Sequence, residues 1–167
     1  MALLLGEGIV SELITYLSAN MAAKLTSLDT AYSDGITLTP PASTSYFWSE
    51  RSEVLQWPFV IVLVERTPIT RHNATRADSQ HDVRIIFAAM DMDTDTLRKK
   101  LYRYARAVME CLLEGRAAAS LTFHFGIDTG KGGQGVVFDF SPILEQEPGQ
   151  FVADCSITFG VYKTEAK

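Results

Sequence analysis

The chain has 167 residues, of which 47% are hydrophobic and 21% are charged, and its formal net charge is -5 at pH 7. This length and composition are typical of one globular domain, here residues 1–167, with enough apolar residues to bury a core. The negative balance excludes the chain as a whole from the nucleic-acid binders that work by neutralising phosphates.

The first predicted element is a helix over residues 9–25. Its apolar residues recur at three- and four-residue spacing, and Ser and Thr occupy the opposite side. Residues 26–45 are rich in Ser, Thr, Asp, Gly and Pro, which predicts an irregular connection with a turn at residues 33–35. Within this connection we expect a short strand at residues 36–39.

Three aromatic residues, Tyr46, Phe47 and Trp48, follow the connection and precede a charged stretch that contains Glu50 and Glu53. One interpretation is an edge segment that covers the core. The other is a contact site for a second chain, because aromatic residues are enriched at the centres of interfaces. The sequence leaves both interpretations open.

Two strands are predicted next. Residues 59–64 form an unbroken apolar run behind Pro58, which is typical of a strand that is covered on both faces. In residues 82–90 the apolar residues alternate, which predicts an interior strand. We expect residues 67–80 between them to be a polar connection that is mobile in the free chain, with a basic group of Arg71, His72 and Arg76.

A long amphipathic helix is predicted after the acidic turn at residues 91–96. Asp93, Thr94 and Asp95 are candidate N-caps, and Gly115 is expected to end the helix in the left-handed conformation. The core face comprises Leu97, Leu101, Tyr104, Ala105, Val108, Cys111 and Leu112. The basic stripe Lys99, Arg103 and Arg106 is interpreted as a solvated face or as a docking site for an acidic neighbour, with Arg106 and Glu110 as an i,i+4 pair.

The C-terminal third predicts more strands. Residues 121–125 alternate, and residues 136–140 and 151–162 are expected to pair. The glycine-rich residues 128–135, with Lys131 and Gln134, predict a second mobile loop. The complete pattern predicts an α+β fold, in which two principal helices pack on a mainly antiparallel sheet.

Recognisable chemistry is absent from this pattern. Lys131 is followed by Gly132 and a strand, whereas a phosphate-binding P-loop requires Ser or Thr and then a helix. The three histidines show no metal-ligand spacing, and Cys111 and Cys155 are interpreted as buried free thiols. No segment has the length of a membrane span or the pattern of a secretory signal. We therefore expect no catalysis, no cofactor and no metal.

The order of elements resembles the tail terminator and tail-completion proteins of long-tailed bacteriophages. The likeness is carried by the helix at residues 9–25, the strand that begins at Trp57-Pro58, the strand-to-helix unit at residues 82–114 and the hairpin at residues 136–162. The resemblance implies a non-enzymatic structural protein of the virion tail or neck, present in the host cytoplasm during assembly.

The same resemblance implies a set of partners. They are further copies of this chain in a ring, expected to be a hexamer, the tail tube protein, and a head-side connector or neck protein. No membrane and no sequence-specific nucleic acid are implied, although DNA passes through the lumen of such a ring. Head-side neck proteins of the same virion share this pattern and are the first alternative. A small α+β enzyme or ligand-binding domain without a recognisable motif is the alternative from another class.

A subunit interface is predicted from the apolar residues that the core face of the long helix leaves over. Tyr102, Met109 and Leu113 form a strip beside the core face, and a monomer would expose it. In a ring, such a strip contacts a different patch on the next subunit. The predicted partners are Tyr46, Phe47 and Trp48, with Glu50 and Glu53 facing Lys99, Arg103 or Arg106.

Overall fold

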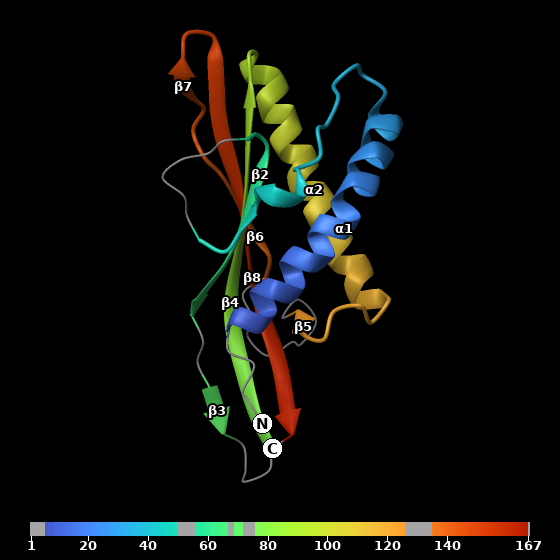
Figure 1. Ribbon diagram of the computed structural model, residues 1–167, viewed down its shortest axis with the longest axis vertical. Coiled ribbons are helices and arrows are strands. Elements are labelled where there is room, and N and C mark those ends of the chain that lie inside the picture. The colour runs from blue at the N-terminus through green and yellow to red at the C-terminus, as the bar shows by residue number, and fades with distance from the viewer. Residues whose placement is uncertain (1–5, 50–55, 67–68, 72–75, 126–134, 167) are drawn as a thin grey trace.

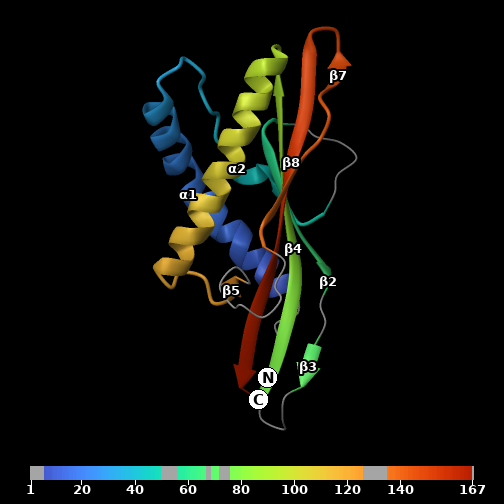
Figure 2. The same cartoon turned by 180° about the vertical axis from the view of Figure 1, so that it is seen from behind.

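The computed structural model describes residues 6–49, 56–66, 69–71, 76–125 and 135–166. Two long helices lie side by side on one face of a mixed, mainly antiparallel sheet, as Figures 1 and 2 show from opposite sides. The predicted α+β fold class is therefore confirmed.

The sheet is organised around two long strands, β4 and β8, which pair antiparallel from Arg76 with Ala166 to Asp91 with Phe151. β2 and β3 pair with the other edge of β4, and β1 joins β2 in parallel. β7, β6 and β5 pair in turn along the outer edge of β8. The strands are β1 (Tyr46–Phe47), β2 (Phe59–Arg66), β3 (Ile69–Arg71), β4 (Arg76–Asp91), β5 (His124–Phe125), β6 (Val137–Phe140), β7 (Leu144–Glu147) and β8 (Gln150–Ala166).

The helices are α1 (Gly6–Tyr32) and α2 (Thr94–Ala117). α1 is longer than the predicted helix, because buried Leu28 continues its apolar stripe beyond residue 25. The predicted irregular connection is therefore wrong over residues 26–32. The turn at residues 33–35 is confirmed, with Ser33 at φ 46° and Gly35 at φ 80°. Residues 36–39 do not form the expected strand, and a short 3-10 helix, η1 (Ser43–Ser45), follows.

The main core lies between the helices and the sheet. The alternating residues of β4 that were predicted to share a face, from Val83 to Ala89, are 0–3% exposed and point to the helices. The apolar face of α2 is buried against them, and the ring of Tyr104 stacks on Phe87 at 4.1 Å between centroids. On the opposite face of the sheet a smaller cluster forms around Phe59, Ile61 and Ala88, so β2 is covered on both faces as predicted.

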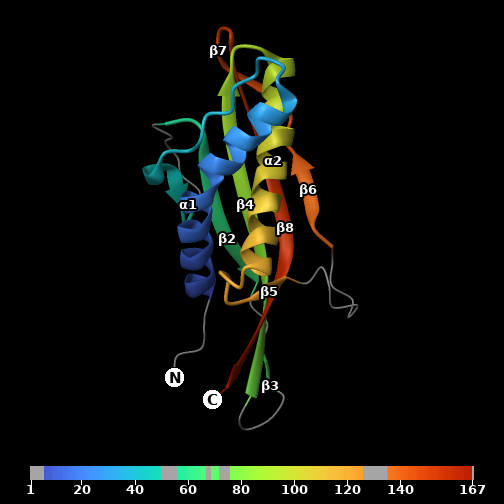
Figure 3. The ribbon, with the colours of Figure 1, turned by 90° about the vertical axis from the view of Figure 1, so that its right-hand side faces the viewer.

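The predicted polar connection at residues 67–80 is wrong over most of its length. Ile69–Arg71 is strand β3, and it pairs with the first residues of β4, which begins at Arg76 rather than at residue 82. Arg71 and Arg76 thus lie in strands, and His72 lies outside the described residues. Figures 1 and 3 show that β3, β4 and β8 continue beyond the helices as a projecting arm. The other predicted loop, with Lys131 and Gln134, is outside the described residues except for Gly135.

Both ends of α2 are closed by local hydrogen bonds. Asp93 is the N-cap, and its carboxylate accepts the backbone N–H of Thr96 at 2.7 Å. That bond lowers the pKa of Asp93. At the C-terminus Ala119 adopts φ 51°, and the N–H of Ser120 donates to the carbonyl of Gly115 at 2.9 Å. This is the hydrogen-bond pattern of a Schellman motif with alanine in the left-handed position.

The prediction that Gly115 takes the left-handed position is wrong. Gly115 lies inside the helix, and a Cβ there would be 2.7 Å from Cζ of Tyr16 on α1. Its role is close packing between the two helices rather than termination.

We expect Ala119→Gly to raise the free energy of unfolding by about 0.5–1 kcal/mol, because glycine adopts the left-handed conformation without the Cβ clash. Gly115→Ala is the matched opposite, and we expect it to lower the same quantity by about 1–3 kcal/mol through overpacking against Tyr16. Urea titrations followed by circular dichroism measure both changes. A stabilising Gly115→Ala would contradict the packing role.

Candidate functional site

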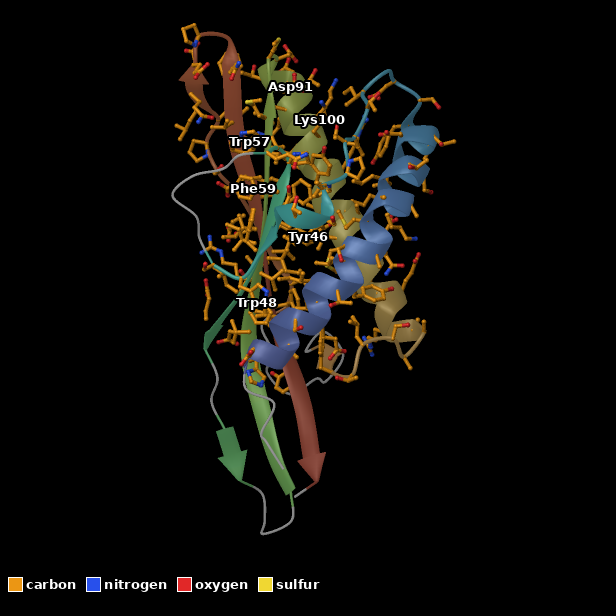
Figure 4. The ribbon with its side chains drawn as sticks, in the orientation of Figure 1. Tyr46, Trp48, Trp57, Phe59, Asp91 and Lys100 are labelled. Carbon is orange, nitrogen blue, oxygen red and sulfur yellow. The ribbon has the colours of Figure 1, made fainter. Side chains whose placement is uncertain are left out.

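Two of the acidic residues around the start of α2, Asp91 and Asp93, have structural partners. Asp91 pairs with Lys100 at 2.7 Å, and the two side chains lie together in Figure 4. Burial acts to raise the pKa of Asp91, but hydrogen bonds from Lys100 and from the N–H of Asp93 lower it overall. Asp93 caps the helix. The described part of the chain holds no cluster of three His, Cys, Asp or Glu side chains arranged for a metal ion.

An open groove lies between α1 and the segment after α2, lined by residues that include Gly8, Ser11, Thr15 and Ser120. Its acidic side chain, Glu12, is engaged with the segment after α2. One carboxylate oxygen accepts the backbone N–H of Thr122, and the other accepts its hydroxyl at 2.7 Å. The carboxylate of Glu12 in this groove therefore joins α1 to residue 122 by hydrogen bonds, and it is not a free polar group. Within the described residues, neither helix is long and apolar enough to cross a membrane.

Cys111 and Cys155 are both buried free thiols, as predicted. Burial raises the pKa of Cys111 to about 11 and that of Cys155 to about 12. Because the thiolate is the reactive form, neither cysteine is suited to nucleophilic chemistry at neutral pH.

We expect neither cysteine to react with an alkylating reagent at pH 8 while the protein is folded, and both to react in denaturant. Intact mass measurement counts the labels. Labelling of the folded chain would show that the corresponding thiol is accessible and would contradict its burial.

Arg103 does not belong to a solvated stripe, so that prediction is wrong. Its side chain is only 6% exposed and forms an ion pair with Asp34, with Nη1 donating to Oδ1 at 3.0 Å. Its guanidinium also lies 4.2 Å from the centre of the Tyr32 ring. The hydrogen bond from Arg103 lowers the pKa of Asp34. Arg103 thus holds the end of α1 and the following turn against α2.

The remaining members of the basic stripe are exposed. Arg106 pairs with Glu110 at 2.7 Å, which confirms the predicted i,i+4 contact, and it also donates to the hydroxyl of Tyr32 at 3.1 Å. Lys99 is exposed and forms no ion pair with another described residue. Of the three predicted basic residues, Lys99 alone is exposed without an ion pair to a described residue.

We expect Arg103→Met to lower the free energy of unfolding by about 1–2 kcal/mol, because the ring contact and the charged hydrogen bonds are lost. Arg106→Met is the exposed control, with an expected change of about 0.5 kcal/mol or less. Since the folded-state pKa of Asp34 is lowered, its contribution is present above the ordinary carboxyl pKa of about 3.9 and is lost as the pH falls. The difference between wild type and Arg103→Met should therefore shrink in acid, as measured by urea unfolding at several pH values.

The aromatic triplet is divided between core and surface. Tyr46 is 8% exposed and packs in the main core, and burial raises the pKa of its hydroxyl. Its predicted contact with a neighbouring subunit is therefore wrong. Phe47 is half-buried beside Phe59, with ring centres 6.1 Å apart, whereas Trp48 is 48% exposed. Figure 4 labels Tyr46, Trp48 and Phe59. Glu50 and Glu53 lie outside the described residues.

The apolar strip on α2 is partly uncovered. Tyr102 and Leu113 are 55% and 46% exposed, and Met109 is half-buried against the core. Met109 therefore has a core role that the sequence interpretation did not assign to it.

Strand β6 extends this strip. The ring of Tyr102 contacts that of Phe140 edge-on, with 4.7 Å between the ring centres. Phe138 and Phe140 lie on the same side of the sheet, because both pair with core residues of β8. Phe138 is 40% exposed. Figure 3 shows β6 beside α2. We call Tyr102, Met109, Leu113, Phe138 and Phe140 the α2–β6 surface. The β6 half of this surface was not predicted from the sequence, although the two-residue spacing of Phe138 and Phe140 was a visible signal.

Comparison with known proteins adds a distant structural likeness. No protein family model and no curated protein matches the chain. A solved structure described as "Virion of native gene transfer agent (GTA) particle" matches with a TM-score of 0.33 and 14% sequence identity, over 88% of this chain and 95% of that chain.

Proposed function

We propose that this chain is a structural subunit of a phage-like virion, which forms a ring that caps the tail tube and joins it to the head-side connector. The observation that carries the proposal is the exposed α2–β6 surface. An apolar patch of this kind, which joins two elements at one edge of the molecule, is typical of a protein–protein contact.

The kind of assembly follows from the resemblance of the element order to tail terminator proteins. The structure bears out the strand-to-helix unit and the closing strands on which that resemblance depends. In this proposal the partners are copies of the same chain, the tail tube protein and a head-side connector or neck protein.

The proposal includes no catalysis and no cofactor. Among the described residues, several side chains that the sequence offered for chemistry have structural roles. Asp91 pairs with Lys100, Asp93 caps α2, Glu12 binds residue 122, and both thiols are buried.

We expect cells that make the particle without this chain to accumulate tail tubes that are longer than normal and not joined to heads, because nothing then stops growth at the tube end. Negative-stain electron microscopy measures tube lengths, and expression of the wild-type chain in trans is the control. Normal-length tubes without heads would instead indicate a head-side neck protein. Normal particles would contradict a role in the virion.

A further inference from the structure

We propose that the α2–β6 surface of one subunit receives the β7–β8 hairpin of the next copy of this chain. The inference rests on the proposed ring and names the two surfaces that hold it together. It replaces the aromatic triplet as the predicted partner, because Tyr46 is buried in the core.

The receiving surface has an apolar centre and one exposed cation, Lys99, beside it. Tyr102, Leu113 and Phe138 supply exposed apolar area. Lys99 precedes Tyr102 by three residues on α2, so the two side chains are neighbours on the helix surface. Lys99 forms no ion pair with a described residue, whereas the charge of Arg106 is balanced by Glu110. A partner that fits this surface presents an apolar side chain next to a carboxylate.

The β7–β8 hairpin presents that combination. Leu144 is 63% exposed, and Glu147 is exposed with no ion pair to a described residue. The other carboxylate of β7, Glu145, accepts the N–H of Gly149 at 3.0 Å and so stabilises the turn. Gly149 itself has φ 76°, which glycine adopts without strain. Figure 1 shows the hairpin at the end of the molecule opposite to the projecting arm.

The two surfaces cannot meet within one chain, because they lie on opposite faces of the sheet. Leu144 pairs with Val152, and Val152 pairs with Met90. Paired residues share a face, and the next residues along β4 and β8, Ala89 and Ala153, point to the helices. Leu144 therefore lies on the face away from the helices, whereas the α2–β6 surface lies on the helix side.

This separation determines the symmetry of the contact. One patch meets a different patch on the next subunit, so the interface is heterologous, and it closes into a ring when the rotation between copies permits. The opposite charges of Glu147 and Lys99 orient the hairpin on the surface.

Single substitutions test each half. We expect Leu144→Asp and Leu113→Asp each to weaken self-association by about 30-fold or more, because each places a carboxylate in the apolar centre of the contact. Trp48→Asp is the control, since Trp48 is exposed but outside the contact, and its dissociation constant should stay within about 3-fold of wild type. Analytical ultracentrifugation over a concentration series measures all four proteins. At a concentration at which all four proteins are monomeric, the thermal midpoints should agree to within about 2 °C, because all three residues are exposed.

A mixing experiment tests the direction of the contact. Leu144→Asp has an intact α2–β6 surface and Leu113→Asp an intact hairpin, so together they retain one good contact and should form a 1:1 heterodimer. Glu147→Lys should weaken assembly, and Lys99→Glu in the same chain should restore it.

Three results would overturn the inference. They are a monomeric wild-type chain at all concentrations, a mixture that stays monomeric, and dissociation by Trp48→Asp but not by Leu144→Asp. The tube-length measurement does not depend on these residues. Failure of the hairpin contact is therefore distinguishable from failure of the proposed function.

Discussion

The structure depends on the pairing of β4 with β8, which extends over all 16 residues of β4. Each other strand of the described sheet attaches to this pair directly or through β2. The register of the pair also decides which residues enter the core, since a slip of one residue would turn Phe87 and its neighbours to the opposite face. The helices therefore find a continuous apolar surface only in the observed register.

The two helices are held together by polar contacts as well as by the core. Arg103 joins the turn after α1 to α2 through Asp34 and Tyr32, and Gly115 lets the two helices approach closely at the other end. These contacts use charged groups that would otherwise be candidates for catalysis. At the start of α2, Asp93 likewise serves as the N-cap and Asp91 pairs with Lys100.

The exposed apolar residues lie on two different faces of the sheet. The α2–β6 surface lies on the helix side at one edge of the sheet, and the exposed Leu144 lies on the other face, near one end. A chain with complementary patches on different faces favours head-to-tail contacts, which produce rings or filaments rather than symmetric dimers. This arrangement agrees with the proposed ring.

The sequence by itself determined the fold class, the interior strand of residues 82–90 and the core face of α2, because these follow from local periodicity. It placed the N-cap of α2 within residues 93–95, and the structure selected Asp93. Only the tertiary structure decided the positions of Arg103, Tyr46 and Phe138. The flexible side chain of Arg103 pairs with Asp34 because the fold brings that carboxylate near. Tyr46 is buried and Phe138 is exposed because of the elements that pack, or do not pack, against each ring. Gly115 shows the same limit, since its role depends on the ring of Tyr16, which lies about a hundred residues earlier in the chain. Periodicity states which residues favour burial, but it does not state which neighbour buries them.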